Sequence, residues 1–257
     1  MIKRIAILGY GIVSYAVFFF TALYAIGFIG NFRSIGNLKI PKTIDGATQL
    51  PLWQALAVDA LLLALFALQH SVMARPAFKR WWTRFIDESA ERSTYVLASS
   101  LALIVLFIYW QPLGGMIWNA ENSGARIFLY ALYAMGWIVV FTSTYLINHF
   151  DLFGLRQVWL QFVGKPYTQL KFVTPWAYRI VRHPLYVGWL LVFWATPTMT
   201  ATHLFFAIMT TVYILIAIRF EERDLVAAHP EYEAYRREVP MLLPRITPTR
   251  STQASLR

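Results

Sequence analysis

The sequence predicts an all-α protein, a polytopic membrane helix bundle of five to six spans. Hydrophobic residues make up 58% of its 257 residues and charged residues only 14%, a balance that a soluble domain of this size rarely shows. The mean hydropathy is +0.50. Apolar runs long enough to cross the hydrocarbon layer, which takes about 20 helical residues, alternate with basic segments. Together these observations indicate an integral membrane protein.

Six apolar runs account for the predicted crossings. Four are full-length candidate spans and cover residues 5–29, 52–68, 95–110 and 127–147. Two shorter runs follow, at 186–197 and 203–218. Six crossings with the last two short fit these runs, and so do four full spans followed by a re-entrant pair. The first run exceeds the roughly 7 to 15 apolar residues of a secretory signal, so we expect it to be an uncleaved span.

The basic residues behind the net charge of +10 are concentrated in segments that would lie on one side of the membrane. All but four of the 23 Lys and Arg residues lie at the start of the chain, in segments 75–92 and 156–182, and from Arg219 onward. By the positive-inside rule these segments face the cytoplasm, so both termini are expected there and the number of crossings is even. The orientation of the protein in the lipid bilayer therefore explains its basic charge, and nucleic acid is not an expected partner.

A single domain is expected over residues 1–246, because no internal repeat and no separate soluble region is visible. The tail 247–257, rich in Thr, Ser and Arg, is expected to be mobile. Cysteine is absent, which excludes disulfides and thiolate metal sites. Gly9 and Gly11 resemble the start of a dinucleotide-binding loop, but no separate strand precedes them. We therefore expect them to serve helix packing.

Histidine is the residue type best suited to removing a proton near neutral pH. The five histidines form no i,i+4 pair, so no metal site is expected. His149 and Asp151 close the fourth span and are candidates for proton removal, although a helix end also collects polar residues that satisfy its free carbonyls. Segment 69–71, Gln-His-Ser, ends the second span with Arg75, and there helix capping is the favoured interpretation.

Polar and aromatic residues bracket the last two apolar runs. Pro184 disfavours helix at His183 and allows a new helix to begin just beyond it. Arg182 and His183 are then expected at a helix N-terminus, which attracts negative groups. On its first turn, Tyr186 and Gly188 would offer an aromatic wall and a gap for a flat ring.

Two adjacent carboxylates, Glu221 and Glu222, leave the last apolar run. Carboxylates accept hydrogen bonds from ribose hydroxyls or a cationic amine. Because the basic segments put both groups on the cytoplasmic side, the bracketing residues are expected to converge in a pocket at one membrane face.

The combined order of these residues forms a pattern over about 170–245. It comprises Tyr178, Arg182-His183-Pro184-Leu185-Tyr186-Val187-Gly188, Glu221-Glu222 with Leu225, Tyr232, Tyr235, Val239-Pro240 and Leu243-Pro244. The pattern resembles the integral-membrane methyltransferases of the isoprenylcysteine carboxyl methyltransferase and phospholipid methyltransferase group. Segments 69–75 and 148–156 look like the bacterial branch that includes methanethiol S-methyltransferase and proteins related to the NnrU family.

The resemblance implies that S-adenosylmethionine (SAM) binds at the cytoplasmic side without a Rossmann domain, in a cofactor-binding part at about 165–245. By position, the cofactor contacts of the family fall on Leu170, Lys171, Phe172, Val173, Tyr178, His183, Pro184, Leu185, Tyr186 and Glu221. Two departures stand out. Ala177 precedes Tyr178 where relatives commonly have Gly, and the glutamate run of relatives is reduced to two, which favours Glu221 over Glu222.

The bacterial branch implies S-methylation of a small thiol in the bacterial inner membrane, with methanethiol converted to dimethyl sulfide. A thiol reacts as its thiolate, so a base or cation must favour that form. Our hypothesis from the sequence is that His149 receives the thiol proton, with Asp151 orienting it or acting itself. Arg182 or Arg156 would stabilise the anion.

Three other functions fit parts of the pattern. A lipid or isoprenoid acceptor would need a lateral groove, which short helices near Pro197 could open. An NADPH-dependent membrane reductase is a second alternative, because sterol reductases resemble the C-terminal region. In a transporter or regulatory membrane protein, Arg182 and Glu221 would belong to a structural ion-pair cluster. The sequence leaves the acceptor and the oligomeric state open.

Overall fold

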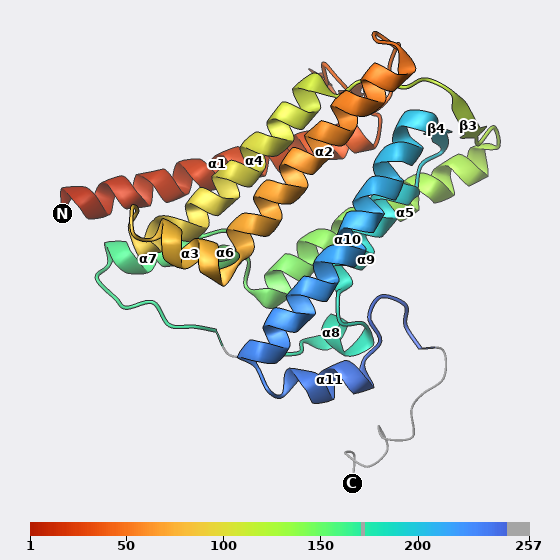
Figure 1. Ribbon diagram of the computed structural model, residues 1–257. Helices are drawn as coiled ribbons and strands as arrows, with labels where there is room; N and C mark the ends of the chain where they lie inside the picture. The colour runs from red at the N-terminus through yellow and green to blue at the C-terminus, as the bar shows by residue number, and fades with distance from the viewer. Residues whose placement is uncertain (171–172, 246–257) are drawn as a thin grey trace.

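The computed structural model describes residues 1–170 and 173–245 and is almost entirely helical (Figure 1). Within these ranges, five helices are long and apolar enough to cross a membrane. They are α1 (Ile2–Ile29), α2 (Leu52–Ala74), α4 (Glu91–Tyr109, preceded by the 3-10 turn η1, Glu88–Ala90), α5 (Ser123–Ile147) and α10 (Ala201–Ala228). These helices confirm the predicted all-α polytopic membrane bundle.

The fifth apolar run forms a short helix. Helix α9 (Pro184–Trp194) has 11 residues, a length of about 16 Å at the α-helical rise, which is half of a hydrocarbon core of about 30 Å. The chain then continues into β4 (Thr198–Thr200), which pairs antiparallel with β3 (Met116–Asn119) just before α5. The chain thus returns to the end of the bundle at which α5 starts (Figure 1).

The last apolar run does not give a short helix, contrary to the expectation that both final segments are short. Helix α10 has 28 residues, because it continues beyond the apolar run through the charged segment 219–224. Its last turns therefore project Glu221 and Glu222 at the end of the bundle where the chain begins (Figure 1).

Short helices gather at this same end. The short helices are α3 (Pro76–Trp82), α6 (His149–Leu152), α7 (Leu155–Phe162), α8 (Trp176–Ile180) and α11 (Tyr232–Glu238). In Figure 1 α3, α6 and α7 lie towards the N-terminus and α8 and α11 lie below α9 and α10, whereas the paired strands β3 and β4 lie at the opposite end of the bundle. A two-stranded hairpin of β1 (Ser34–Ile35) and β2 (Leu38–Lys39) completes the described elements.

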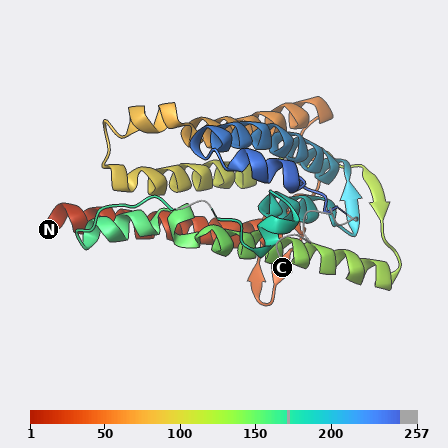
Figure 2. The same cartoon turned by 90° about the horizontal axis from the view of Figure 1, so that it is seen from below.

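The long helices form two sides of one bundle. Seen from below, α2 and α10 lie on one side and α1 and α5 on the other (Figure 2). Helix α4 packs between α1 and α2, and α9 packs between α5 and α10. Buried aromatic rings join this arrangement: Trp110, fully buried, lies 6.4 Å from Phe28 of α1 and 5.5 Å from Phe206 of α10 between ring centroids.

Two glycines bring α9 against α5. A Cβ on Gly136 would lie 2.9 Å from the carbonyl oxygen of Gly188, and a Cβ on Gly188 would lie 2.8 Å from the amide nitrogen of Val140. Small residues permit such close backbone approach between membrane helices. The space beside Gly188 is therefore filled by α5, and our expectation that it admits a flat ring is wrong. The same contact fixes where the N-terminus of α9 lies.

Candidate active site

The chain turns into α9 at Arg182, His183 and Pro184. As predicted, Pro184 is the first residue of the helix and His183 its N-cap, with non-helical φ and ψ of −126° and 64°. Both side chains before the proline are nearly buried, with Arg182 10% and His183 4% exposed. A buried cation requires a compensating partner.

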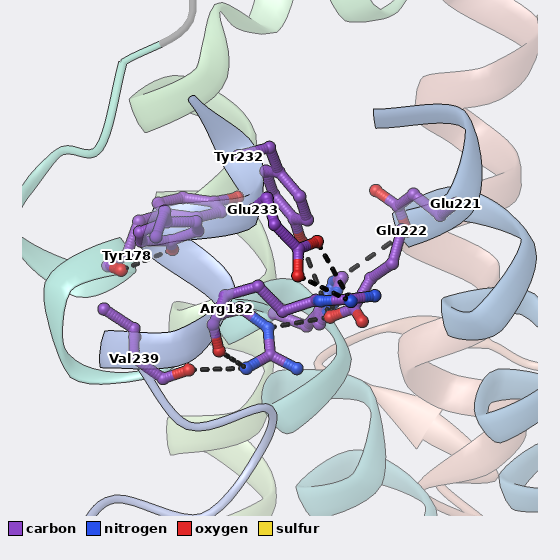
Figure 3. A network of polar contacts seen from close by, with 10 residues as sticks. Tyr178, Arg182, Glu221, Glu222, Tyr232, Glu233 and Val239 are labelled. Atoms are coloured by element: carbon purple, nitrogen blue, oxygen red, sulfur yellow. Dashed lines mark hydrogen bonds and ion pairs between the residues drawn. The ribbon is translucent and has the colours of Figure 1, made fainter. Parts of the chain in front are cut away.

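That partner is Glu222 (Figure 3). The Arg182 Nε donates to Glu222 Oε1 at 2.7 Å, and His183 Nε2 lies 3.0 Å from the same oxygen. Arg182 Nη1 also donates to the carbonyl oxygens of Val239 at 2.5 Å and Arg236 at 2.9 Å. This cluster, called the Arg182 lock below, ties α9, α10 and the end of α11 together. Such complete engagement favours a structural role for Arg182 over contact with a thiolate.

The neighbouring carboxylate has a different environment. Glu221 has a side chain that is 44% exposed, and the Tyr186 hydroxyl donates to its Oε2 at 2.8 Å. In Figure 3 Glu221 and Glu222 both extend from α10, but only the Glu222 side chain points towards Arg182. An ionised carboxylate offers about four acceptor positions, so Glu221 keeps the capacity to bind a further donor.

Tyr178 of α8 reaches the same region. Its carbonyl oxygen accepts a hydrogen bond from the Tyr235 hydroxyl at 2.5 Å, which fixes α8 on α11. Burial, reinforced by the charge of Glu221, raises the pKa of Tyr178, so its phenol is protonated and able to donate at neutral pH. The structure thus brings Tyr178, His183, Tyr186 and Glu221 to one place.

The other residues of the predicted cofactor set are less closely associated. Pro184 is buried and Leu185 half-buried on the first turn of α9. Leu170 and Val173, 38% and 60% exposed, lie on the connection between α7 and α8. Lys171 and Phe172 lie outside the described residues, as does the tail 247–257.

A cavity borders the Arg182 lock. Its volume is about 350 Å³, and it is lined by Arg219, Glu222, Arg223, Val226 and Arg236. Three of these side chains are cationic, so the cavity favours an anionic group such as a carboxylate. Among residues 1–170 and 173–245, no group of three or more His, Asp or Glu side chains is arranged to hold a metal ion.

His149 lies elsewhere, between α1, α5 and α6. It is 5% exposed, with Nε2 2.8 Å from the Tyr15 hydroxyl and Nδ1 2.9 Å from Thr144 Oγ1. The Thr144 hydroxyl donates to the Phe141 carbonyl at 2.7 Å, so the network assigns the ring proton to Nδ1. The imidazole stacks on Tyr145 at 4.3 Å. Burial lowers the pKa of His149, so the ring is neutral at pH 7.

Asp151 does not orient His149. Its Oδ1 accepts from Arg156 Nη1 at 2.7 Å and its Oδ2 from the Tyr167 hydroxyl at 3.3 Å. The ring nitrogens of His149 are engaged by other groups, so the expected His149–Asp151 pair is not formed. The cause is local: His149 and Asp151 lie two residues apart on the single turn of α6, and helical residues at that spacing do not face each other.

The helix-end interpretation of Gln69, His70 and Ser71 is also wrong. Helix α2 continues to Ala74, so these side chains lie within the helix and bond its neighbours. On α4, Ser99 Oγ lies 3.1 Å from His70 Nδ1 and 3.3 Å from Gln69 Nε2. The Tyr95 hydroxyl lies 2.8 Å from His70 Nε2. Tyr95 and Ser99 share one face of α4 at i,i+4 spacing, which is the sequence signal that could have revealed this network.

Comparison with known proteins gives closely related sequences. A methanethiol S-methyltransferase of Crocosphaera subtropica is 57% identical over 244 residues, which cover 95% of this chain and 93% of that protein. A methanethiol S-methyltransferase of Mycobacterium tuberculosis is 52% identical over 94% of this chain and 97% of its own length. Nurim of Rattus norvegicus is 32% identical over 66% of this chain and 68% of its own.

No protein-family model and no solved structure matches the chain. The relatives match almost from end to end, however, and their shared region includes the α9 turn, the Arg182 lock and the long helices. This protein belongs to the methanethiol S-methyltransferase family.

Proposed function

We propose that the protein transfers the methyl group of SAM to methanethiol and so forms dimethyl sulfide. The observation that carries this proposal is the identity of 57% and 52% to relatives named for this reaction, over more than nine-tenths of each chain. When bound, SAM supplies a sulfonium-activated methyl group. The protein has to hold the donor, align the thiol behind the methyl carbon and keep water away.

The residues around α9 fit the donor. Glu221 is a partly exposed carboxylate with spare acceptor capacity, suited to ribose hydroxyls or an ammonium group. The phenols of Tyr178 and Tyr186 offer aromatic faces beside it, which attract cations. Together with His183, Pro184 and Leu185 they form the described part of the proposed SAM site, and Leu170 to Val173 would complete it.

The Arg182 lock supports this site without entering it. By joining α9 to α10 it sets the spacing between Tyr186 and Glu221, so the guanidinium orients the groups that bind the donor. We also propose that this end faces the cytoplasm of a bacterium, where SAM is made, and that both termini lie there. The distribution of Lys and Arg supports that orientation.

A direct test uses the detergent-solubilised full chain with methyl-labelled SAM and methanethiol. Labelled dimethyl sulfide is expected in the headspace. Activity on a lipid or isoprenoid acceptor with none on methanethiol would overturn the substrate assignment. Thermal stabilisation by NADPH and not by SAM would overturn the enzyme class.

A further inference from the structure

The two arginines expected beside the thiol are already paired. Arg156 binds Asp151 at 2.7 Å, and Arg182 binds Glu222 at the same distance. Arg92 of α4 differs: within the described residues no carboxylate lies in ion-pair range of it, and its guanidinium carbon lies 5.3 Å from the ring centroid of Tyr95. An unneutralised cation at this position is suited to hold a nearby anion.

Tyr95 connects Arg92 with the partly buried imidazole of His70. Its hydroxyl lies 2.8 Å from His70 Nε2 and 3.1 Å from Nδ1, and Ser99 Oγ also lies 3.1 Å from Nδ1. The network is satisfied when Nδ1–H donates to Ser99 and Tyr95 O–H donates to Nε2, a tautomer assigned from the hydrogen bonds. His70 Nε2 is then a proton acceptor, and Tyr95 is the group through which a proton reaches it.

The same cluster approaches the proposed SAM site. The hydroxyls of Tyr95 and Tyr186 lie within electrostatic range of each other and of Glu221, and Tyr213 of α10 lies in the same range. Tyr186 donates directly to Glu221. By contrast, the hydrogen-bond partners described for His149 are Tyr15 of α1 and Thr144 near the end of α5. Of these two histidine networks, the one around His70 is the one that extends towards residues that would bind the donor.

One further acceptor is left over in the cluster. Gln69 Oε1 is buried, and it has no hydrogen-bond partner within residues 1–170 and 173–245. Buried polar atoms without partners are rare in proteins, because each costs free energy that a hydrogen bond would recover. The unused oxygen lies on the residue next to His70, so this cluster has an unfilled polar position.

We propose that the acceptor thiol binds between α2, α4 and α10, next to Tyr95, and that His70 accepts its proton through the Tyr95 hydroxyl. This inference rests on the proposed function. The S–H bond breaks as its proton moves to the Tyr95 oxygen and the Tyr95 proton moves to His70 Nε2. The sulfur electron pair then forms the new bond to the methyl carbon while the bond from that carbon to the sulfonium breaks. Dimethyl sulfide and S-adenosylhomocysteine leave, and His70 releases the proton to solvent.

The charge of Arg92 acts on both partners of this step: it favours the thiolate and disfavours a protonated His70. Arg92 from α4 stabilises the developing thiolate, and Tyr213 and Glu221 from α10 and Tyr186 from α9 are the other ionisable groups that face the cluster. A simple alkyl thiol is almost entirely protonated at pH 7, so a positioned base accelerates its reaction, typically by about 10² to 10⁴-fold.

The test compares His70→Gln and Tyr95→Phe with the wild-type protein on methanethiol and on hydrogen sulfide, a more acidic acceptor of similar size. Tyr24→Phe is the matched control, because that hydroxyl donates to the Lys42 carbonyl in the connection between α1 and α2. On methanethiol at pH 7 we expect kcat/KM to fall about 10²-fold or more for His70→Gln, and about 10-fold for Tyr95→Phe. Stabilisation by SAM should be unchanged.

The loss of kcat/KM in the two variants should be smaller with hydrogen sulfide as the acceptor and at high pH, because the acceptor then ionises without a base. Wild-type kcat/KM and an unchanged pH profile in His70→Gln would overturn the inference. So would an equal loss on both acceptors at every pH, because that result marks a structural role. If His70→Gln does not fold, as judged by its response to SAM, Tyr95→Phe decides by the same criteria. A wild-type protein that binds SAM and methylates neither thiol would contradict the proposed function itself.

Discussion

Glu221 and Glu222 are neighbours in the chain, yet they belong to different regions of the molecule. Glu222 is buried between Arg182 and His183 in a lock that joins three helices. Glu221 is 44% exposed beside Tyr186, facing the residues that would bind the methyl donor. A turn of 100° along α10 therefore separates a carboxylate that holds the fold from one that is free to bind a ligand.

The hydrogen-bond networks of His149 and His70 show a similar contrast. His149 is enclosed by Tyr15, Thr144 and Tyr145, and none of these contacts leads to α9 or α10. His70 is linked through Tyr95 to the vicinity of Glu221. Both imidazoles lie at the same end of the bundle, so the difference lies in where their partners lead. A polar network indicates function when one of its members borders the ligand site.

The largest effect on the free energy of unfolding is expected when the Arg182 lock is broken. Glu222→Gln leaves the Arg182 guanidinium buried without its counter-charge, and removing one partner of a buried pair costs about 3 to 5 kcal/mol. Reversible unfolding in detergent measures this loss. The matched control is Glu233→Gln, which breaks a more exposed pair with Arg236 and should cost about 1 kcal/mol or less. Equal effects would refute the distinction between the two pairs.

Glu221→Gln should give the opposite result. We expect SAM affinity to fall about 10- to 100-fold, equivalent to about 1.4 to 2.8 kcal/mol, with little change in unfolding of the ligand-free protein. Calorimetric titration with SAM and thermal unfolding without it give the two values. Glu238→Gln, at an exposed carboxylate on α11, is the control. A stability loss as large as that of Glu222→Gln would place Glu221 in the lock.

Tyr15→Phe should have a smaller effect, confined to stability. It removes one hydrogen bond to His149, and a bond of this kind contributes about 1 kcal/mol. Methyl transfer should stay within about twofold of the wild-type rate, because a 0.4 kcal/mol change in barrier corresponds to that factor. A loss of turnover without a loss of stability would show that the His149 network takes part in the reaction.

The smallest expected effect is a difference in melting temperature between the wild type and a His149 variant on acidification. Burial lowers the pKa of His149 below its unfolded value, so its neutral form is favoured in the fold. The stability associated with that preference is present above the unfolded pKa, about 6.5, and is lost as the pH falls through that value towards the folded pKa. Between pH 7.5 and 5.5 the melting temperature of His149→Gln should therefore fall less than that of the wild type. An equal loss in both proteins would contradict this linkage.

Much of the architecture could be predicted from hydropathy and charge. The long helices follow from apolar runs, and the start of α9 follows from Pro184 after His183. The shortness of α9 also follows from its apolar run, but the pairing of β4 with β3 after it was not accessible, because that pairing depends on distant residues. The full length of α10 was missed for a related reason: a helix can continue past its apolar run when charged residues such as Glu222 find partners.

The candidate site also has features that could be predicted from the sequence and features that could not. The family resemblance favoured Glu221 over Glu222 and predicted Tyr178, His183 and Tyr186 as neighbours of the donor. Local chemistry suggested a pair of His149 with Asp151, which their spacing on the single turn of α6 prevents. The bond between His70 and Tyr95 joins two helices, and the register between helices is not encoded in either one alone. Such pairings require the packed bundle.

The central claim is that this protein methylates methanethiol from a donor held at Glu221. Its most direct test is the amount of labelled dimethyl sulfide formed from methyl-labelled SAM at subsaturating concentration, by the wild type and by Glu221→Gln. We predict labelled product from the wild type, and at least tenfold less from the variant while its unfolding is unchanged. Wild-type yield from Glu221→Gln, or no labelled dimethyl sulfide from a folded wild-type protein, would contradict the account.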